Sequence, residues 1–370
     1  MKRIKDPIHS YILVEDEYLP LIDSSVMQRL RFVKQLGMAS LVYPGANHTR
    51  FEHSLGTYHL AKLFNEHIDL GKEIVVAALL HDIGHGPFSH TSDNVSMRIA
   101  KKGHLDHTCR RIESNAISVI IESLGMSVKT VKALIRGRRP CGTLLSGSLD
   151  VDRLDYLMRD SYYTGANFGS IDIGRLLTGL KIERNRVIID EKCVSTVESI
   201  LTARSLMYPS VYYHHTVRIA GIMMESAIEH EIEEGRLGPE ELMDMDDPML
   251  ISFMRRAKNK EWERIERRKL YKIAYTLPYR KKNKRSVRVI EEGKHDLGDG
   301  IIIDNIAPPI WVEMDLSVEM KDGGIKRIAE VSSLASILSK AQRDHYRLVI
   351  YAPEEKKGEV RKRVKKIAEE

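Results

Sequence analysis

Apolar residues in the first two thirds of the chain recur mainly at intervals of three and four. This spacing places them along one face of a helix and therefore predicts helices rather than strands. The expected helices cover residues 55–64, 73–81, 107–124, 127–136, 148–160, 195–207 and 217–234. Within the second of these, the block Ile74–Leu80 is entirely apolar, which predicts a helix buried on all sides. Gly84, Gly86 and Pro87 are expected to end it abruptly.

The segment after Asp23 is expected to form one more helix, because Ser24 and Ser25 are typical N-cap residues. Its apolar residues stand three apart, and a stop is expected at Gly37. They are Met27, Leu30, Val33 and Leu36.

Alternation of apolar and polar residues predicts few strands before residue 235. A short extended or hairpin segment is expected over 3–21, and a hairpin over 180–189 that turns near 183–185. After Gly235 the pattern changes: strands are expected at 286–290, 301–303, 311–318 and 347–351, with a helix over 326–343. The sequence therefore predicts a mainly α fold, with a large helical domain over 1–235 and a smaller C-terminal α+β lobe over 236–370.

Composition narrows the class of protein. With 42% hydrophobic and 30% charged residues in a chain of 370, disorder throughout is excluded. No apolar run approaches the roughly 20 residues that a membrane helix needs, and no apolar stretch follows the basic residues near Met1, so we expect no secretory signal. Three cysteines far apart do not suit a disulfide framework. We expect a cytoplasmic protein, and a net charge of +6 suits an anionic ligand.

Residues 255–285 are strongly basic, with fourteen lysines and arginines against three glutamates. Nucleic-acid binding is one interpretation of this basic stretch, but solvated helix faces explain such runs more often. The aromatic residues among these charges have a spacing that fits one buried helix face. They are Trp262, Tyr271, Tyr275 and Tyr279.

The candidate chemistry gathers directly after the apolar helix. His81 and Asp82 are adjacent there, and a neutral imidazole beside a carboxylate suits a divalent transition metal. Two ligands are too few for a site, but His53 could supply a third and Asp152 a fourth, leaving positions for water and a phosphate oxygen. A lone His-Asp pair is more often an ordinary hydrogen-bonded residue pair. The glycine-rich context favours a site, because burying so many titratable groups is costly.

These residues resemble a known signature. His53, His81-Asp82 and Asp152 are similar to the H…HD…D pattern of the HD superfamily of metal-dependent phosphohydrolases. The strings at 27–37, 43–46, 50–56 and 81–90 resemble the deoxynucleoside triphosphate triphosphohydrolase branch, which includes bacterial dGTPases. The resemblance covers 3–232 strongly and continues weakly beyond.

The resemblance implies a function and its requirements. It implies hydrolysis of dGTP, or of dNTPs generally, to the deoxynucleoside and triphosphate, with a divalent ion (Mn, Mg, Fe, Zn or Ni) as cofactor. It also implies a homodimer or homotetramer, with an effector nucleotide at subunit contacts as a further possibility for the basic stretch.

The resemblance also implies roles for single residues. His53, His81, Asp82 and Asp152 match the metal ligands. His90 with Asp93 resembles the pair that protonates the leaving 5′ oxygen, while His85 and His107 match histidines that contact the α-phosphate. The expected substrate-binding residues are Arg50, Arg153 and Arg204 for the triphosphate, and Gln35, Leu36, Tyr156, Asp160 and Tyr212 around the sugar. Tyr208 departs from the pattern of this branch, since a histidine occupies the position in its mammalian member.

Two alternative functions stay open at the level of sequence. A nucleotide phosphomonoesterase or phosphodiesterase would use His85 and His90 for a second metal. A non-enzymatic nucleotide- or nucleic-acid-binding regulator would use the basic stretch. Cys109, close to His104 and His107, could suggest zinc, but we expect a thiol packed on a helix because no second ligand pair follows.

Overall fold

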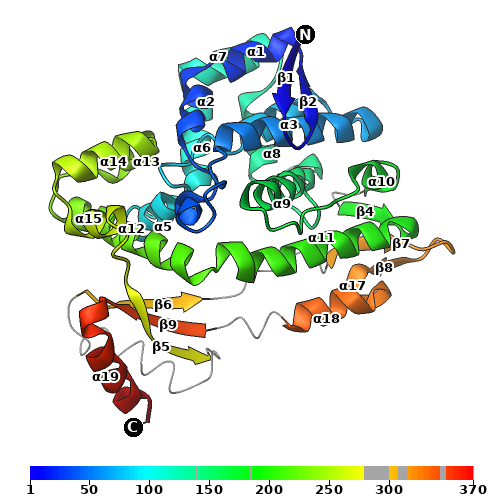
Figure 1. Cartoon of the computed structure of the whole chain (residues 1–370). Helices are drawn as coiled ribbons and strands as arrows, with labels where there is room; N and C mark the ends of the chain where they lie inside the picture. Colours follow the sequence, from blue (N-terminus) through cyan, green and yellow to red (C-terminus); the bar gives the residue numbers. More distant parts are fainter. Residues whose placement is uncertain (139, 184–185, 279–299, 307–314, 342–346, 370) are drawn as a thin grey trace.

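The computed structural model describes residues 1–138, 140–183, 186–278, 300–306, 315–341 and 347–369. The fold is mainly α, as predicted, with small sheets: one lies at the N-terminus, and the others contain strands from the C-terminal part (Figure 1). Among these residues, none of the helices combines the length and the apolar character needed to cross a bilayer. The predicted strand at 286–290 lies outside the described residues.

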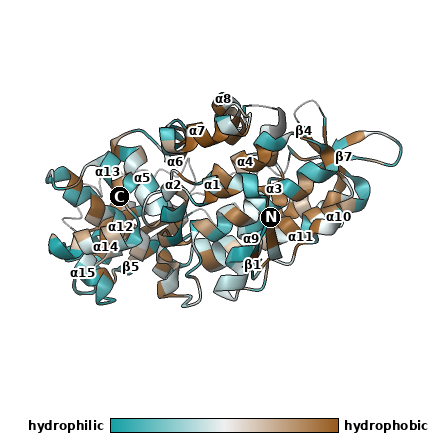
Figure 2. Ribbon diagram, turned by 90° about the horizontal axis from the view of Figure 1, so that it is seen from above, coloured by the Kyte–Doolittle hydropathy of each residue, from teal (hydrophilic) through white to brown (hydrophobic). Residues whose placement is uncertain are grey.

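The N-terminal part is built from helices that contribute to two apolar clusters. Their bounds are α1 Leu19–Ile22, α2 Ser25–Arg29, α3 Arg50–Ile68, α4 Lys72–Leu80, α5 His90–Ile99, α6 His104–Ile112, α7 Asn115–Ser123, α8 Val128–Ile135, α9 Val151–Thr164, α10 Ile173–Leu177, α11 Val194–Met207 and α12 His215–Glu233. The seven residues Ile74–Leu80 are all buried, which confirms the prediction for α4. The helix α3 packs against α4 and α9, and Figure 2 shows that most helices carry apolar residues along one side.

The C-terminal half adds short helices and two sheets. Its helices are α13 Pro239–Asp244, α14 Asp247–Arg256, α15 Lys260–Glu266, α17 Ile328–Val331, α18 Ser333–Ala341 and α19 Lys357–Glu369. The strands of the described residues, including those of the N-terminal part, are β1 Lys2–Asp6, β2 Ser10–Val14, β3 Leu180–Glu183, β4 Arg186–Asp190, β5 Lys272–Pro278, β6 Ile302–Ile306, β7 Ser317–Glu319, β8 Ile325–Arg327 and β9 Arg347–Ala352.

Strand pairing ties the two halves of the chain together. The strands β1 and β2 form the predicted hairpin, with Ile4 opposite Ile12. The hairpin β3–β4, also predicted, is extended by β7 and β8, since Ile189 of β4 pairs in parallel with Val318 of β7. A separate antiparallel sheet has the order β5-β9-β6.

Several predicted elements differ from the fold. The helix expected to end at Gly37 ends at Arg29, because the chain turns extended at Val33 and Lys34 bridges Thr49. The helix expected over 107–124 is two helices, with a break at Ser114, whose hydroxyl donates to the carbonyl of Arg111.

The aromatic residues of the basic stretch do not share one helix face. Trp262 lies in α15, but Arg268 adopts a left-handed backbone conformation, and the chain then enters β5, which contains Tyr275. Tyr279 lies outside the described residues. In the described part of 326–343, the expected helix is instead β8, α17 and α18, with an interruption at Ser332. Of the strand expected over 311–318, residues 311–314 lie outside the described residues, while Ser317 and Val318 belong to β7.

Candidate active site

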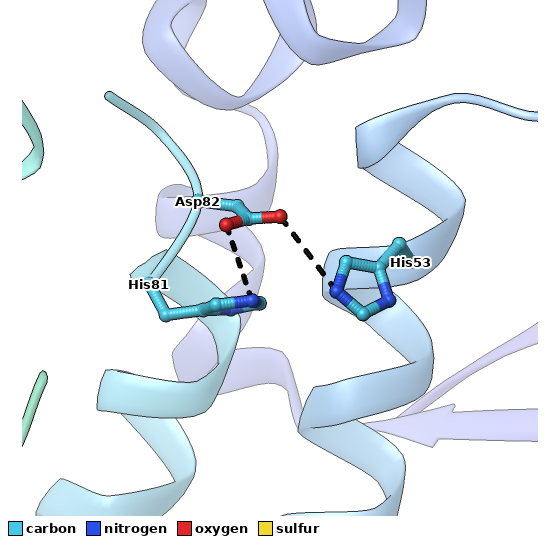
Figure 3. A group of neighbouring side chains, drawn as sticks. All are labelled: His53, His81 and Asp82. Carbon is cyan, nitrogen blue, oxygen red and sulfur yellow. Dashed lines mark ion pairs between the residues drawn. The ribbon is translucent and has the colours of Figure 1, made fainter. Parts of the chain in front are cut away.

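The ends of two helices bring three potential metal ligands together. His53 lies on α3, while His81 and Asp82 follow directly after α4. One ligand atom of each lies within 4.8 Å of the others, and all three side chains are buried. Figure 3 shows Asp82 between the two rings, with Oδ1 at 3.3 Å from His81 Nε2 and Oδ2 at 3.6 Å from His53 Nε2.

Asp152, the predicted fourth ligand, joins this group from the first turn of α9. Its Oδ1 lies 3.0 Å from His53 Nε2 and 3.8 Å from His81 Nε2. Asp150 caps the helix by accepting a hydrogen bond from the backbone N–H of Arg153 at 2.7 Å, so α9 begins at Val151. The four predicted ligands therefore converge in the fold.

Both histidines are oriented through their second nitrogen. His81 donates from Nδ1 to the carbonyl oxygen of Ala78 at 2.8 Å, and His53 Nδ1 lies 2.8 Å from Asp155 Oδ2. Such bonds leave Nε2 as the nitrogen available to a cation. His81 Nε2 is buried and has no hydrogen-bond partner among the described residues. A free imidazole lone pair beside two carboxylates fits a divalent metal ion.

Charge in this group is balanced between carboxylates and cationic side chains. Burial lowers the pKa of His53, but hydrogen bonds to Asp152 and Asp155 outweigh it and raise this pKa to about 10. Burial raises the pKa of Asp82, but the charges of Arg50 and His81 hold it well below its ordinary value. The carboxylates therefore keep their charge, and a divalent cation would replace the proton that balances them.

Asp155 anchors a layer of residues behind the ligands that sequence reasoning did not identify. The Oδ1 atom of Asp155 lies 2.7 Å from His9 Nε2. Arg159 donates from Nε to Oδ2 of Asp155 at 2.8 Å and from Nη2 to Oδ1 at 3.0 Å. Arg159 also donates from Nη1 to Asp6 at 2.8 Å, so the β1–β2 hairpin holds this layer in place. The spacing of Asp152 and Asp155, three residues apart on one helix, could have indicated it.

A cavity of about 620 Å³ opens beside the ligand group. The predicted substrate-binding residues all line it, together with Asp82, Asp152, His85 and His90. The predicted substrate-binding residues in this lining are Gln35, Leu36, Arg50, Arg153, Tyr156, Asp160, Arg204 and Tyr212. Residues 217–225 of α12 form a further wall that sequence reasoning missed.

Arg50 connects the ligand group to the cavity. Its Nη1 donates to Asp82 Oδ2 at 2.5 Å and its Nε donates to Ser89 Oγ at 2.7 Å. Its Nη2 is buried and finds no hydrogen-bond partner in the described part of the chain. The guanidinium therefore has a donor left for an anion in the cavity.

Three histidine rings stand together at the cavity. His85 stacks on His104 with a centroid distance of 4.2 Å and meets His90 edge-on at 5.3 Å. Asp93 is paired with His104: its Oδ2 lies 2.9 Å from His104 Nδ1, and its Oδ1 accepts a hydrogen bond from the backbone N–H of His104.

His107 does not lie where its predicted role requires. It is buried against Ser96 of α5, with Nε2 at 3.2 Å from the Ser96 hydroxyl, and is not part of the cavity lining. One helical turn separates it from His104, which does line the cavity. Of these two histidines of α6, His104 is therefore the one that lines the cavity.

Aromatic and acidic residues form the neighbouring wall. Tyr212 donates from its hydroxyl to Asp160 Oδ2 at 2.7 Å, and Asp160 Oδ1 lies 2.8 Å from His48 Nε2. Tyr156 and Tyr212 meet edge-on at 6.3 Å. Because these contacts immobilise both rings, this wall has a defined shape.

Other ligand combinations considered from the sequence are not assembled. Within the described ranges, His53, His81 and Asp82 are the group of three or more potential ligands that converges, so His85 and His90 do not make a second one. Cys109 is buried on α6, where burial raises the pKa of its thiol, as expected for a packed side chain.

Comparison with protein families agrees with this geometry. Residues 50–159 match the HD domain, and residues 171–369 match the HD associated region. The chain belongs to the HD superfamily. HD domains bind divalent metal ions, and the matched segment contains all four predicted ligands.

Relatives cover most of the chain. An uncharacterized protein of Methanocaldococcus jannaschii is 38% identical over 394 residues, which cover all of this chain and 84% of the relative. A crystal structure of a hypothetical protein from Aquifex aeolicus has a TM-score of 0.84 at 30% identity and covers 98% of this chain and 99% of that one.

Several relatives carry a functional name. A homolog of deoxynucleoside triphosphate triphosphohydrolase SAMHD1 from Dictyostelium discoideum is 29% identical over 310 residues, which cover 74% of this chain and 60% of that protein. The predicted resemblance to this branch of the HD superfamily is confirmed.

Proposed function

We propose that this HD-superfamily phosphohydrolase cleaves deoxynucleoside triphosphates to the deoxynucleoside and triphosphate. The observation that carries the proposal is one cavity that combines four convergent metal-ligand candidates with three arginines and a tyrosine–aspartate wall. The name of the Dictyostelium relative supports the same substrate class.

His53, His81, Asp82 and Asp152 would hold one divalent ion, whose identity among Mn, Mg, Fe, Zn and Ni stays open. When bound, such an ion supplies a Lewis acid and lowers the pKa of water. Asp155 and the Ala78 carbonyl keep the two imidazoles turned toward it.

The arginines would bind and orient the triphosphate. Arg50 has a buried Nη2 directed to no described residue, and Arg153 and Arg204 line the same cavity. Positively charged donors that are already in place stabilise the charge that builds up on phosphate oxygens in the transition state. A phosphate held here would lie beside the ligand group, because Arg50 also binds Asp82.

His90 would protonate the leaving sugar oxygen. It is exposed to the cavity, whereas His85 beside it is buried. Desolvation, followed by the charges of Arg50 and His104, lowers the pKa of His90 to about 4 in the absence of substrate. The negative charge of a bound triphosphate would raise this pKa toward neutrality, so that the proton arrives with the substrate.

The sugar would lie against Tyr156 and Tyr212. Asp160, held by His48 and Tyr212, and the buried Gln35 would offer hydrogen bonds to the 3′-hydroxyl. Because the two tyrosine rings are fixed by their neighbours, an added 2′-hydroxyl would find little room. Deoxyribonucleotides should therefore be preferred to ribonucleotides.

The test is incubation of the purified protein with each dNTP and rNTP and with Mn²⁺ or Mg²⁺, with products identified by mass. We expect triphosphate and deoxynucleoside from dNTPs, and Asp82→Ala should abolish turnover and lower the bound metal. Release of triphosphate by Asp82→Ala at the wild-type rate, or monophosphate as the first product, would refute the proposal.

A further inference from the structure

One wall of the cavity is contributed by α12 and carries an arginine outside the predicted site. Val217, Arg218, Gly221, Ile222 and Glu225 line the cavity along successive turns of this helix. Both carboxylate oxygens of Glu225 are engaged, since they accept hydrogen bonds from Asn94 and Arg98, each at 2.8 Å. Arg218 is therefore the cationic side chain on this wall that faces the cavity.

Arg218 is held rigidly by the C-terminal sheet. Its Nε donates to Asp304 Oδ2 at 3.1 Å and its Nη2 donates to Asp304 Oδ1 at 2.5 Å. Asp304 lies on β6, is 6% exposed, and also accepts a hydrogen bond from the hydroxyl of Tyr351 at 3.4 Å. Burial lowers the pKa of Arg218, but Asp304 raises it and the net shift is upward, so the side chain stays charged.

The two bonds to Asp304 determine which donors remain. A guanidinium is planar, with its N–H groups arranged in a fixed fork. Asp304 occupies the edge formed by Nε and one N–H of Nη2. The other edge, with one N–H from Nη1 and the second from Nη2, points away from Asp304 and presents two parallel donors.

We propose that Arg218 is a specificity-determining residue that recognises the base of the nucleotide and favours bases with a keto oxygen. Guanine presents two acceptors, O6 and N7, to such a donor pair, and thymine presents O4. Adenine and cytosine present an amino group at the corresponding position, which would oppose the arginine N–H groups.

The position of Arg218 relative to the rest of the cavity favours the base over the phosphates. This step rests on the proposed function: the phosphates lie at Arg50 beside the ligand group, and the sugar lies at Tyr156 and Tyr212. The lining left for the base includes α12 together with Met38, Phe88, Thr91 and Tyr213. Gly221 leaves room there, since a Cβ on it would come no closer than 3.9 Å, to Thr91 Oγ1.

The experiment compares the four dNTPs as substrates of the whole chain with Mn²⁺, using kcat/KM for wild type and Arg218→Gln. Wild type should prefer dGTP, then dTTP, over dATP and dCTP by roughly tenfold, the discrimination of a good bidentate contact. In Arg218→Gln the introduced amide would pair with adenine N6 and N7, so the dGTP to dATP ratio should fall by roughly tenfold. Because each ratio comes from one preparation, partial misfolding of a variant does not change it.

Arg236→Gln is the matched control. Arg236, beyond the end of α12, donates from Nε to the buried Glu231 at 2.7 Å but does not line the cavity. The ratio of kcat/KM for dGTP to that for dATP should therefore be the same in Arg236→Gln as in wild type. Equal kcat/KM for dGTP and dATP in wild type, or an unchanged ratio in Arg218→Gln, would overturn the role of Arg218.

The same ratios are measured as affinities by titration calorimetry. If the protein cleaves no dNTP, the proposed function fails. The affinities then still decide the role of Arg218: a preference for dGTP that Arg218→Gln removes supports it, and equal affinities overturn it.

Discussion

At the scale of single residues, Asp155 shows how a carboxylate that never reaches the cavity can orient a potential metal ligand. It contacts His53 Nδ1 and is itself held by His9 and Arg159. Burial raises the pKa of Asp155, but Arg159 and the hydrogen bonds from the two histidines hold it well below the ordinary value. His53 is therefore turned with Nε2 toward Asp82 and Asp152.

Asp155→Asn should lower the affinity for Mn²⁺ by about 10- to 100-fold, because an amide orients the imidazole less firmly and leaves it less basic. Titration calorimetry measures this affinity. Asp304→Asn is a matched control, since it also disturbs a buried pair of a carboxylate with an arginine but lies away from His53. An unchanged Mn²⁺ affinity in Asp155→Asn would contradict the assigned role.

The two histidines of α6 allow a second comparison. His104 lines the cavity and is paired with Asp93, whereas His107 is buried against Ser96. His104→Gln should reduce kcat on a dNTP by about 100-fold or more, the usual effect of losing one donor to the phosphate oxygens in the transition state. His107→Gln should stay within a few-fold of wild type, and the reverse order would restore the role first predicted for His107.

At the scale of elements, the approach of α3 to α9 depends on a glycine. A Cβ built on Gly56 of α3 would lie 1.9 Å from Asp155 Oδ1 and 2.5 Å from Arg159 Nη2. These side chains are fixed by the ion pair between them, so they cannot withdraw cheaply. The close contact of the two helices is therefore what brings Asp152 and Asp155 to His53.

Gly56→Ala should lower the free energy of unfolding by about 1–3 kcal/mol, the usual cost of overpacking, and weaken Mn²⁺ binding with it. Urea unfolding and calorimetry measure the two effects. Gly358→Ala in α19 is the control, because nothing lies within 4 Å of its Cβ and alanine favours helix. Equal stability of Gly56→Ala and wild type would show that the helices can separate without cost.

A turn next to the cavity is held by an acid from α14. Phe88 and Ser89 both have positive φ, at 54° and 55°, a strained conformation for side chains other than glycine. Asp247 accepts from the backbone N–H of Phe88 at 2.7 Å and from that of Lys34 at 3.2 Å. It therefore ties the turn that positions Ser89, and hence Arg50, to the segment that carries Gln35.

Asp247→Asn should lower kcat on a dNTP about tenfold while metal content stays that of wild type, because the amide can accept only at Oδ1 and one of the two segments is released.

Burial raises the pKa of Asp247 to about 6. Between about pH 4 and 6 the carboxyl of Asp247 is therefore protonated in the folded state but ionised in the unfolded state. The free energy of unfolding of wild type should consequently fall relative to that of Asp247→Asn as the pH rises through this window. Urea unfolding at pH 4.5 and 7 measures the difference, and a constant difference would contradict it.

At the scale of the whole molecule, the two halves of the chain share a core. Met38, Phe88 and Val95 pack in one apolar cluster with Trp262 of α15 and Tyr351 of β9. The parallel pairing of β4 with β7 is a second link. The boundary between 1–235 and 236–370, the homodimer or homotetramer, the effector nucleotide and the cytoplasmic location stay predictions.

A chain cut after residue 235 should therefore not keep an ordered site. It would expose the shared cluster and lose both Asp247 and Asp304. We expect self-association and loss of dNTP turnover, measured by light scattering and product analysis. A monomeric fragment with wild-type activity would show that the C-terminal half is dispensable for the site.

The sequence by itself determined the helical core and the residues at the centre of the site. Helical spacing of apolar residues specifies α11, because a helix needs only one consistent face to be buried. In α4 a fully apolar block has the same effect. The His-Asp pair and its distant partners were recognisable because the chemistry requires these residue types in this order. Local spacing alone misplaced the helix after Asp23, where the bridge between Lys34 and Thr49 outweighs helical periodicity.

Only the tertiary structure decided which of the candidate side chains meet. His9 and Asp155 are 146 residues apart, Phe88 and Asp247 are 159 apart, and Arg218 and Asp304 are 86 apart. No periodicity along the chain encodes such pairs, because they depend on how helices and sheets pack. The same reason separates His104 from His107: both lie on α6, and the packing of that helix decides which of them faces the cavity.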